Sequence, residues 1–301
     1  STLLPLSNTF IKEQLLSYNR WRGVLIGTWK AADGLSLKGL DHRLLMGARP
    51  DFFRRWIWKV RRRIGLASRR NLLELDRENA DLVHVHFGTS AVEIWPVVRR
   101  LGLPMVVTLH GFDITDKRDY WETGRGGYLM KTYPARLASL AAEPNVRFIA
   151  VSDAIARKAI QFGIPAQKVT TCHIGVDTEQ FKPGGVEIIF RRPRILYIGR
   201  LTEKKGADKL VKAFYQVLDK IPEAELVIAG DGPMRAQLEG LAEAAGDRIC
   251  LLGAVSSEIV KLQMNEARVF CLPSLTADNG DAEGLPIAIL EAGAMGLPVV
   301  I

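Results

Sequence analysis

Residues 281–300 read DAEGLPIAILEAGAMGLPVV, which predicts a loop, a helix and a strand in close succession. Glu283 precedes the expected helix, Gly284 allows a ligand to approach the backbone, and Pro286 suits the first helical position. Glu291 follows about two turns into the helix, so both carboxylates can border one cleft. Taken singly, Glu283 would only stabilise the helix dipole and Glu291 would be an ordinary surface acid.

The same alternation of strands and helices extends along most of the chain. Short runs rich in Val, Ile and Leu are separated by segments with helical periodicity, which indicates parallel sheets covered by helices. Ser152 and Ser256 stand where helix caps are expected. The strand candidates are Val24–Ile26, Leu82–His86, Met105–His110, Val146–Val151, Ile195–Ile198, Glu225–Ala229, Ile249–Leu252, Val269–Leu272 and Pro298–Ile301. The helix candidates include Val92–Leu101, Ala154–Phe162, Ala207–Ile221 and Met234–Ala245.

With 301 residues, the chain exceeds the usual size of one hydrophobic core, so two domains are expected. The polar stretch GVDTEQFKPGGVEIIFRRP, residues 175–193, separates two alternating halves, and Asp177 within it is interpreted as a turn former. We therefore predict an N-terminal domain over residues 1–182 and a C-terminal domain over residues 183–301. The first carries 28 Lys and Arg against 17 Asp and Glu, and the second carries 13 against 16, so the net charge of +8 is uneven.

The amino-acid composition is that of a soluble globular protein. The chain is 48% apolar and 25% charged, as soluble globular proteins are, and no stretch approaches the roughly 20 apolar residues that span a bilayer. Its start lacks a charged leader, and Cys172, Cys250 and Cys271 each lie in an apolar stretch, which predicts core positions in a reducing cytoplasm. The sequence begins without Met and stops inside the strand GLPVVI, so the C-terminal domain is expected to be truncated.

A second candidate site is IGRLTEKKG, residues 198–206. A strand leads into a turn at Gly199 that presents Arg200, Lys204 and Lys205 before the next helix. Open α/β sheets bind ligands at the carboxyl ends of their strands, and a diphosphate suits an Arg fork beside a Lys point charge. The alternative is a solvated turn with ordinary surface cations. No GxxxxGK[ST] motif appears, so this is no phosphate loop of the nucleoside-triphosphatase type.

Residues 52–66, FFRRWIWKVRRRIGL, form a basic segment with an apolar stripe at Phe52, Trp56, Val60 and Ile64. A basic amphipathic helix of this kind suits an anionic membrane interface, although the stripe would equally pack on its own domain. The segment has no feature of a nucleic-acid-binding fold, so no nucleic-acid partner is expected. The predicted membrane contacts are Arg54, Arg55, Trp56, Arg61, Arg62 and Arg63.

Several motifs in order identify a family resemblance. The string AEGLPIAILEAGAMGLPVV with its Glu-x7-Glu spacing, GRLTEKKG and AGDGP (229–233) resemble the retaining GT-B glycosyltransferases of glycosyltransferase family 4. The first half agrees, with HVHFG (84–88), VVTLHGFD (106–113), FIAVSDAI (148–155) and HIGVDTEQF (173–181). PLSNTFIKEQ (5–14) and TADNGDAEGLP (276–286) resemble the branch that builds bacterial exopolysaccharides and colanic-acid-like polymers. The resemblance implies an α/β GT-B fold of two Rossmann-like domains facing across a cleft.

The resemblance also implies roles for individual residues. On the donor side, Arg200 and Lys205 would hold the diphosphate, Gly284 and Leu285 would offer backbone amides, and Glu291 would bind the ribose. Glu283 and His110 would contact the donor sugar as catalytic residues. Ser7 and Asp113 would lie on the acceptor side.

The implied reaction is transfer of a hexose from a nucleotide sugar to a lipid-linked or polysaccharide acceptor, with retention of the anomeric configuration. UDP is the default nucleotide and GDP the alternative. No DxD pair and no Cys/His spacing suggests a metal, and no cofactor is expected because the cations can stabilise the leaving group. The predicted location is cytoplasmic, at the inner face of the membrane. The alternatives are a GT-B nucleotide-sugar epimerase and a non-catalytic membrane-associated scaffold.

Overall fold

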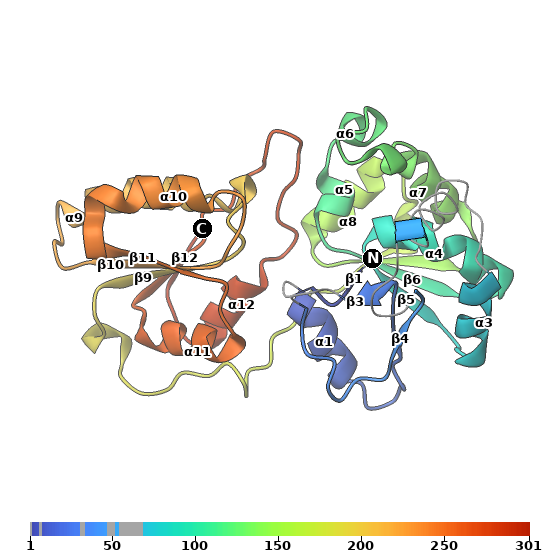
Figure 1. Cartoon of the computed structure of the whole chain (residues 1–301), viewed down its shortest axis with the longest axis horizontal. Coiled ribbons are helices and arrows are strands. Elements are labelled where there is room, and N and C mark those ends of the chain that lie inside the picture. Colours follow the sequence, from blue (N-terminus) through green and yellow to red (C-terminus); the bar gives the residue numbers. More distant parts are fainter. Residues whose placement is uncertain (1, 6–7, 31–33, 47–51, 54–68) are drawn as a thin grey trace. The chain divides into compact units, whose positions relative to one another are not determined.

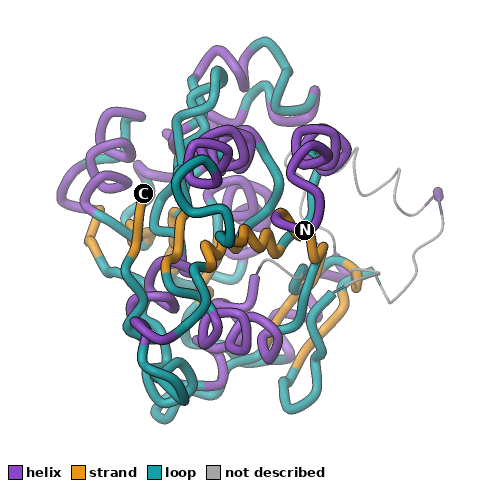
Figure 2. Tube along the Cα trace, turned by 90° about the vertical axis from the view of Figure 1, so that its left-hand side faces the viewer, coloured by secondary structure: helices purple, strands orange, loops and turns teal. Residues whose placement is uncertain are grey.

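The computed structural model describes residues 2–5, 8–30, 34–46, 52–53 and 69–301, and the chain divides into two compact units, Ser1–His173 and Ile174–Ile301. Helices alternate with strands along most of both units, and Figure 2 distinguishes the two kinds of element by colour. All nine strand candidates are confirmed to within two residues at each end. The alternation of apolar runs therefore predicts the fold class correctly.

A parallel sheet in the order β5-β6-β7-β8 forms the centre of the first unit (Figure 1). Its strands are β5 (Val83–His86), β6 (Met105–Leu109), β7 (Val146–Ala150) and β8 (Val169–Thr171). Its helices are α3 (Arg69–Arg77), α4 (Gly88–Arg100), α5 (Phe112–Thr115), α6 (Arg118–Glu122), α7 (Tyr133–Ala142) and α8 (Asp153–Phe162). The residues before them form α1 (Thr9–Leu16) and two small parallel pairs, β1 (Thr2–Leu3) with β3 (Trp29–Lys30) and β2 (Leu25–Gly27) with β4 (His42–Leu44).

Side chains from the sheet and its helices form the core of the first unit. Val107 and Phe148 lie opposite each other on β6 and β7, and both are buried with Tyr133 and Leu137 of α7. Burying such side chains stabilises the fold by roughly 1.5–3 kcal/mol each. Helix α8 begins as predicted, because the Ser152 hydroxyl accepts a hydrogen bond from the Ile155 amide at 3.3 Å.

The second unit contains a five-stranded parallel sheet in the order β11-β10-β9-β12-β13. Its strands are β9 (Arg194–Ile198), β10 (Glu225–Ala229), β11 (Ile249–Gly253), β12 (Val269–Cys271) and β13 (Val299–Val300). The helices α9 (Ala207–Leu218) and α10 (Arg235–Ala242) lie on one face, and α11 (Ser257–Glu266) and α12 (Ile287–Ala294) lie on the other (Figure 1). The direction of strand addition therefore reverses between β9 and β12, which is where open α/β sheets bind ligands.

The first compact unit ends at His173, which is nine residues before the predicted domain boundary between residues 182 and 183. The difference arises because residues 174–182 pack with the second unit. Phe181 is 4% exposed within that unit's core, and Val176 packs against the same core. Asp177 forms the expected turn, since its Oδ1 accepts hydrogen bonds from the amides of Glu179 and Gln180.

The prediction that all three cysteines are core residues is correct only for Cys271, which is buried in β12. Cys172 and Cys250 are exposed. The reason is their place in the sheets: Cys172 follows the edge strand β8, and Cys250 lies in the edge strand β11. Apolar neighbours in sequence do not distinguish an edge strand from a central strand.

Across the residues that the structure describes, no helix combines the length and the apolar character that crossing a membrane requires.

Candidate functional site

The loops after β9 and β12 meet at the strand reversal of the second unit. The Leu275 amide donates to the carbonyl of Lys204 at 2.8 Å. Gly206 has φ +65, and a Cβ at this position would lie 2.0 Å from the carbonyl oxygen of Pro273. A side chain would collide with the backbone there, so glycine allows the two loops to pack directly against each other. The IGRLTEKKG stretch and the loop that carries Glu283 are thereby brought to one edge of the sheet.

Two lysines and two carboxylates form an ion-paired cluster between these loops. Lys205 Nζ lies 2.9 Å from Glu283 Oε2, and Lys204 Nζ lies 2.9 Å from Asp281 Oδ1 and 3.5 Å from Glu283 Oε1. These four side chains are 16–21% exposed, so the pairs are largely shielded from solvent. We call Lys204, Lys205, Asp281 and Glu283 the lysine–carboxylate cluster.

Several polar atoms in or beside the cluster are buried without a hydrogen bond, although one of them, Glu283 Oε1, keeps its ion pair with Lys204. They are Thr202 Oγ1, Ser274 Oγ and Glu283 Oε1, three of the four such side-chain atoms in the described residues. Thr202 begins the turn that ends at Lys205, and Ser274 precedes Leu275, whose amide bonds to Lys204. Buried polar groups in proteins are nearly always hydrogen-bonded, so their concentration here is typical of a site whose hydrogen bonds a polar ligand completes.

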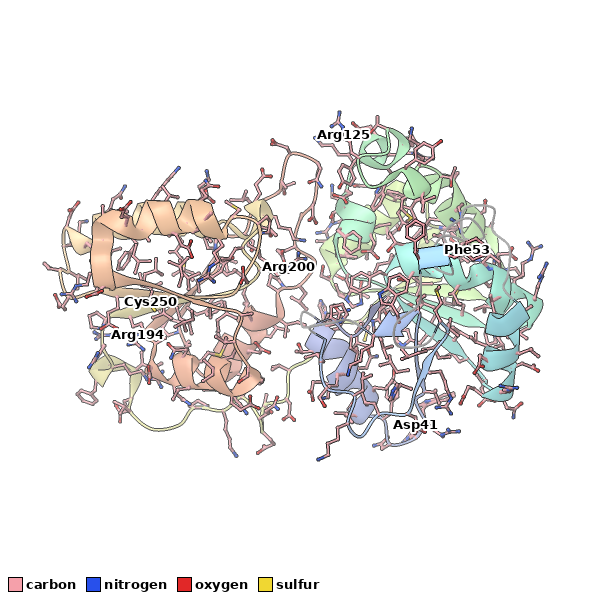
Figure 3. All side chains as sticks on the ribbon, viewed as in Figure 1. Asp41, Phe53, Arg125, Arg194, Arg200 and Cys250 are labelled. Atoms are coloured by element: carbon pink, nitrogen blue, oxygen red, sulfur yellow. The ribbon has the colours of Figure 1, made fainter. Side chains whose placement is uncertain are left out.

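Arg200 occupies the first turn after β9, labelled in Figure 3, and its side chain is exposed. Its carbonyl accepts a hydrogen bond from the Tyr197 hydroxyl at 3.2 Å, which ties the turn to the buried ring of β9. Arg194, also labelled, begins the same strand and pairs with Glu225 at the opposite end of the sheet. Arg200 therefore lies at the end of the sheet that also carries the lysine–carboxylate cluster.

Helix α12 begins one residue later than predicted. Pro286 caps it with extended backbone, at φ −68 and ψ 112, and Ile287 is the first helical residue. Glu283, Gly284 and Leu285 all lie in the loop before the helix, as predicted, but Glu291 is only the fifth residue of the helix. Burial raises the pKa of Glu291 to about 7.

The first unit carries its own cluster at the carboxyl ends of β5 and β6. His86 is the last residue of β5, and His110 follows β6. His86 Nδ1 and His110 Nε2 are 3.0 Å apart. Burial lowers the pKa of His86 to about 2 and that of His110 to about 3, so both imidazoles are neutral near pH 7.

Asp113 holds the turn that carries His110. Its carboxylate accepts hydrogen bonds from the amides of Gly88 at 2.8 Å, Gly111 at 3.0 Å and His110 at 3.2 Å, and its carbonyl accepts one from the Tyr133 hydroxyl. The side chain is 0% exposed, and burial raises its pKa to about 6. These contacts are those of a residue that positions the His110 turn, and in this arrangement an acceptor has no access to the carboxylate.

Sequence reasoning alone gives no role to three residues that the structure brings to these clusters, which are Lys204, Thr202 and His86. The His-x-His spacing on β5 was the one available signal for His86, because alternate residues of a strand face the same side. Of the remaining predicted residues, Ser7 and the basic positions 54–63 lie outside the described residues. Phe52 and Phe53, just before that segment, are 84% and 66% exposed.

Among the described ranges, no His, Cys, Asp and Glu side chains gather in a group of three that could hold a metal ion.

Two family descriptions match the chain in succession. The family described as Glycosyltransferase Family 4 matches residues 34–180, and the family described as Glycosyl transferases group 1 matches residues 185–301. The two matches meet within the polar stretch between the halves. Nearly the whole chain from residue 34 onward is therefore matched by glycosyltransferase families.

The chain is similar to proteins of surface-polysaccharide synthesis. It is 35% identical over 227 residues to the amylovoran biosynthesis glycosyltransferase AmsK of Erwinia amylovora, covering 73% of this chain and 53% of that protein. It is 31% identical over 233 residues to the putative colanic acid biosynthesis glycosyltransferase WcaL of Escherichia coli (strain K12), with the same coverage of 73% and 53%. The chain thus spans about half the length of the curated relatives it matches.

Solved structures agree in fold. Sucrose-phosphate synthase from Thermosynechococcus elongatus matches with a TM-score of 0.72 at 17% identity, covering 99% of this chain and 76% of that chain. Anabaena HepE in complex with UDP and glucose matches with a TM-score of 0.68 at 19% identity, covering 93% and 73%. At these identities the likeness concerns the fold, which is GT-B with two Rossmann-like domains. The successive family matches and the relatives above 30% identity together show that the chain belongs to the family 4 type of GT-B glycosyltransferases.

Proposed function

We propose that this protein is a retaining, metal-independent glycosyltransferase that moves a hexose from a nucleotide sugar to a lipid-linked or polysaccharide acceptor in bacterial exopolysaccharide synthesis. The observation that carries the proposal is the lysine–carboxylate cluster at the strand reversal of the second unit. Family membership supports glycosyl transfer, and the names of the similar amylovoran and colanic acid proteins support the polysaccharide acceptor.

The cluster supplies both kinds of contact that a nucleotide sugar needs. A diphosphate binds through charge-assisted hydrogen bonds, which Lys205 and the exposed Arg200 can donate. Glu283 is an acceptor for sugar hydroxyls. In the structure it is paired with Lys205 at 2.9 Å. A bound phosphate would compete for that lysine and release the Glu283 oxygens toward the sugar.

The same groups account for leaving-group stabilisation. Departure of the nucleoside diphosphate builds negative charge on the bridging oxygen, and cations fixed beforehand in a shielded site stabilise it without reorganising. Gly284 and Leu285, in the loop before α12, would add backbone contacts, and Glu291 would bind the ribose. The acceptor hydroxyl would attack from the same face as the departing diphosphate, so that retention needs no carboxylate nucleophile.

The proposed donor nucleotide is UDP. HepE, similar in fold, was solved with UDP-glucose, whereas a similar mannosyltransferase of Mycobacterium tuberculosis is named as GDP-mannose-dependent. Both nucleotides are compared in the experiment below.

We also propose that the protein binds an anionic membrane surface, because residues 52–66 are basic and aromatic. Sedimentation with anionic and neutral vesicles tests this partner.

The experiment is a thermal-shift panel of UDP- and GDP-sugars, followed by turnover with the stabilising donor and polyprenyl-linked or polysaccharide acceptors. We expect one donor to stabilise the protein and its sugar to be transferred with retained configuration, as read by NMR of the product. The variant E283Q should lose transfer by about a hundredfold or more while still binding the nucleoside diphosphate, because the sugar contact and the phosphate contacts use different groups. Unchanged turnover in E283Q would remove Glu283 from the mechanism. If product forms from the donor without any acceptor, the protein is a nucleotide-sugar epimerase. If no donor is turned over, it is a non-catalytic scaffold.

A further inference from the structure

The first unit contains a row of three histidines that its neighbouring strands bring together. His84 and His86 lie two residues apart on β5, on the same face, with ring centroids 4.7 Å apart and an interplanar angle of 28°. The His110 ring stacks next, with its centroid 5.2 Å from that of His86. Because β5 and β6 pair in parallel, with His86 opposite Thr108, the end of one strand lies beside the residue that follows the other.

Within the row, one hydrogen bond connects the histidines of β5 to His110, the proposed catalytic histidine. His86 Nδ1 and His110 Nε2 are separated by 3.0 Å. Between two neutral imidazoles, one nitrogen must donate and the other must accept. If His110 Nε2 donates, His110 Nδ1 carries no proton and is an acceptor. If His86 Nδ1 donates, His110 Nδ1 carries the proton and is a donor.

The end of the row, His84, makes a different bond. Its Nε2 lies 2.7 Å from the Thr108 hydroxyl on β6. His84 therefore shares the strand face, the stacking and the partial burial of His86, but its bond goes to a threonine rather than to His110. This difference makes His84 a matched control for His86.

Other contacts fix the His110 ring in place. The rings of Phe10 and Phe87 each lie 4.7 Å from its centroid. Phe87 adopts φ 72, a strained conformation for an aromatic residue, and its amide donates to the Thr108 carbonyl at 2.8 Å. The packing limits the position of the His110 ring, while the bond to His86 couples the tautomer of one ring to that of the other.

We propose that His86 is the positioning residue of His110: through the Nδ1–Nε2 hydrogen bond, the tautomer of His86 sets the tautomer that His110 presents to the donor sugar. This rests on the proposed function and on the contact with the donor sugar that the family resemblance implies for His110. A ring whose free nitrogen alternates between donor and acceptor would satisfy the sugar hydroxyl only part of the time. A fixed tautomer means that the hydrogen-bonding nitrogen of His110 is already in the required state before the donor binds. Hydrogen-bond partners fix the tautomer of metal-bound histidines in the same way.

The test uses two substitutions of His86 and one of His84. H86F keeps a stacked ring and removes the hydrogen bond. H86N places an amide near the former Nδ1 and can restore the bond. H84F makes the same chemical change two residues away. Each variant is labelled with ¹⁵N-histidine, and the tautomer of His110 is determined from its ring nitrogen signals in the donor-free protein, which has only five histidines.

We expect a single His110 tautomer in the natural protein, a changed or averaged tautomer in H86F, and recovery in H86N. In turnover, H86F should lower kcat by about ten- to a hundredfold with little change in the donor KM, because orientation is lost rather than binding. H84F should stay within about twofold of the natural protein. The combination of a tautomer change and a kcat loss confined to His86 supports the proposal.

Three results would overturn it. His110 signals that do not move in H86F would show that the hydrogen bond does not set the tautomer. Equal kcat losses in H84F and H86F would reduce the effect to packing. A changed tautomer with unchanged kcat would mean that the tautomer has no role at the sugar. Failure of the proposed function is distinguishable from all three, because it appears as absent turnover in the natural protein, whereas the ring signals are recorded without donor.

Discussion

At the scale of single residues, the site depends on groups whose charge is set by their surroundings. Glu283 is paired with Lys205 and stays close to a second lysine, whereas Glu291, in α12, has no such compensation and its pKa rises to about 7 through burial. Two carboxylates eight positions apart therefore differ in their surroundings: Glu283 is paired with two lysines, whereas burial brings the pKa of Glu291 close to neutral pH.

The substitution E291Q tests this difference. A raised pKa means that the folded protein binds more protons than the unfolded chain between about pH 4.5 and 7. Wild-type stability should therefore fall as the pH rises through that window, by up to about 3 kcal/mol before screening by solvent reduces the effect. E291Q lacks this loss, so it should be the more stable protein at pH 8 and should match the wild type near pH 4. Urea unfolding at both pH values measures it, and parallel pH profiles would contradict the assigned pKa.

At the scale of elements, the reversal between β9 and β12 positions the site, and close backbone packing maintains it. Gly206 lets the loop after β9 touch Pro273, and Gly230, at φ +149, would place a Cβ 1.9 Å from the Gly199 carbonyl. Both glycines follow strands in loops that approach the candidate site. Backbone can pack against backbone at these points only because no side chain intervenes.

Replacing Gly206 with Ala should destabilise the protein by about 2–4 kcal/mol, because the Cβ collides with the Pro273 carbonyl and the left-handed φ is unfavourable for alanine. The matched control is Gly240, which lies within α10 with open space around its Cβ position. G240A should be neutral or stabilise by up to about 1 kcal/mol through helix propensity. Denaturant unfolding compares the two, and equal stabilities would contradict the tight approach of the loops.

Much of this arrangement was predictable from sequence, and the exceptions have physical reasons. The strands rich in buried Val, Ile and Leu and the helix cap at Ser152 depend on neighbouring residues in the sequence. The sequence pattern is therefore enough to predict them. Helix α12 begins one residue after its predicted start, because Pro286 is the extended cap residue before the helix rather than its first residue. The His86–His110 bond and the Lys204–Asp281 pair join residues 24 and 77 positions apart, so their formation depends on strand order and loop packing. No local pattern encodes these distances.

At the scale of the whole molecule, each compact unit corresponds to one glycosyltransferase family match and carries one cluster. The first unit holds neutral, buried histidines and most of the positive charge, and the second holds the lysine–carboxylate cluster. The proposed reaction gives each cluster a role: the cations hold the donor phosphates, and His110 contacts the donor sugar.

The central claim is that the loops after β9 and β12 bind a nucleoside diphosphate. Calorimetric titration of UDP, with GDP in parallel, into the natural protein, K205A and the control K212A tests it most directly. Lys212 is exposed on α9, so its loss removes the same charge from the same unit without touching the cluster. We predict that the natural protein and K212A bind the preferred nucleotide alike and that K205A binds it at least about tenfold more weakly. Equal affinity in K205A and K212A, or no binding of either nucleotide to the natural protein, would contradict the account.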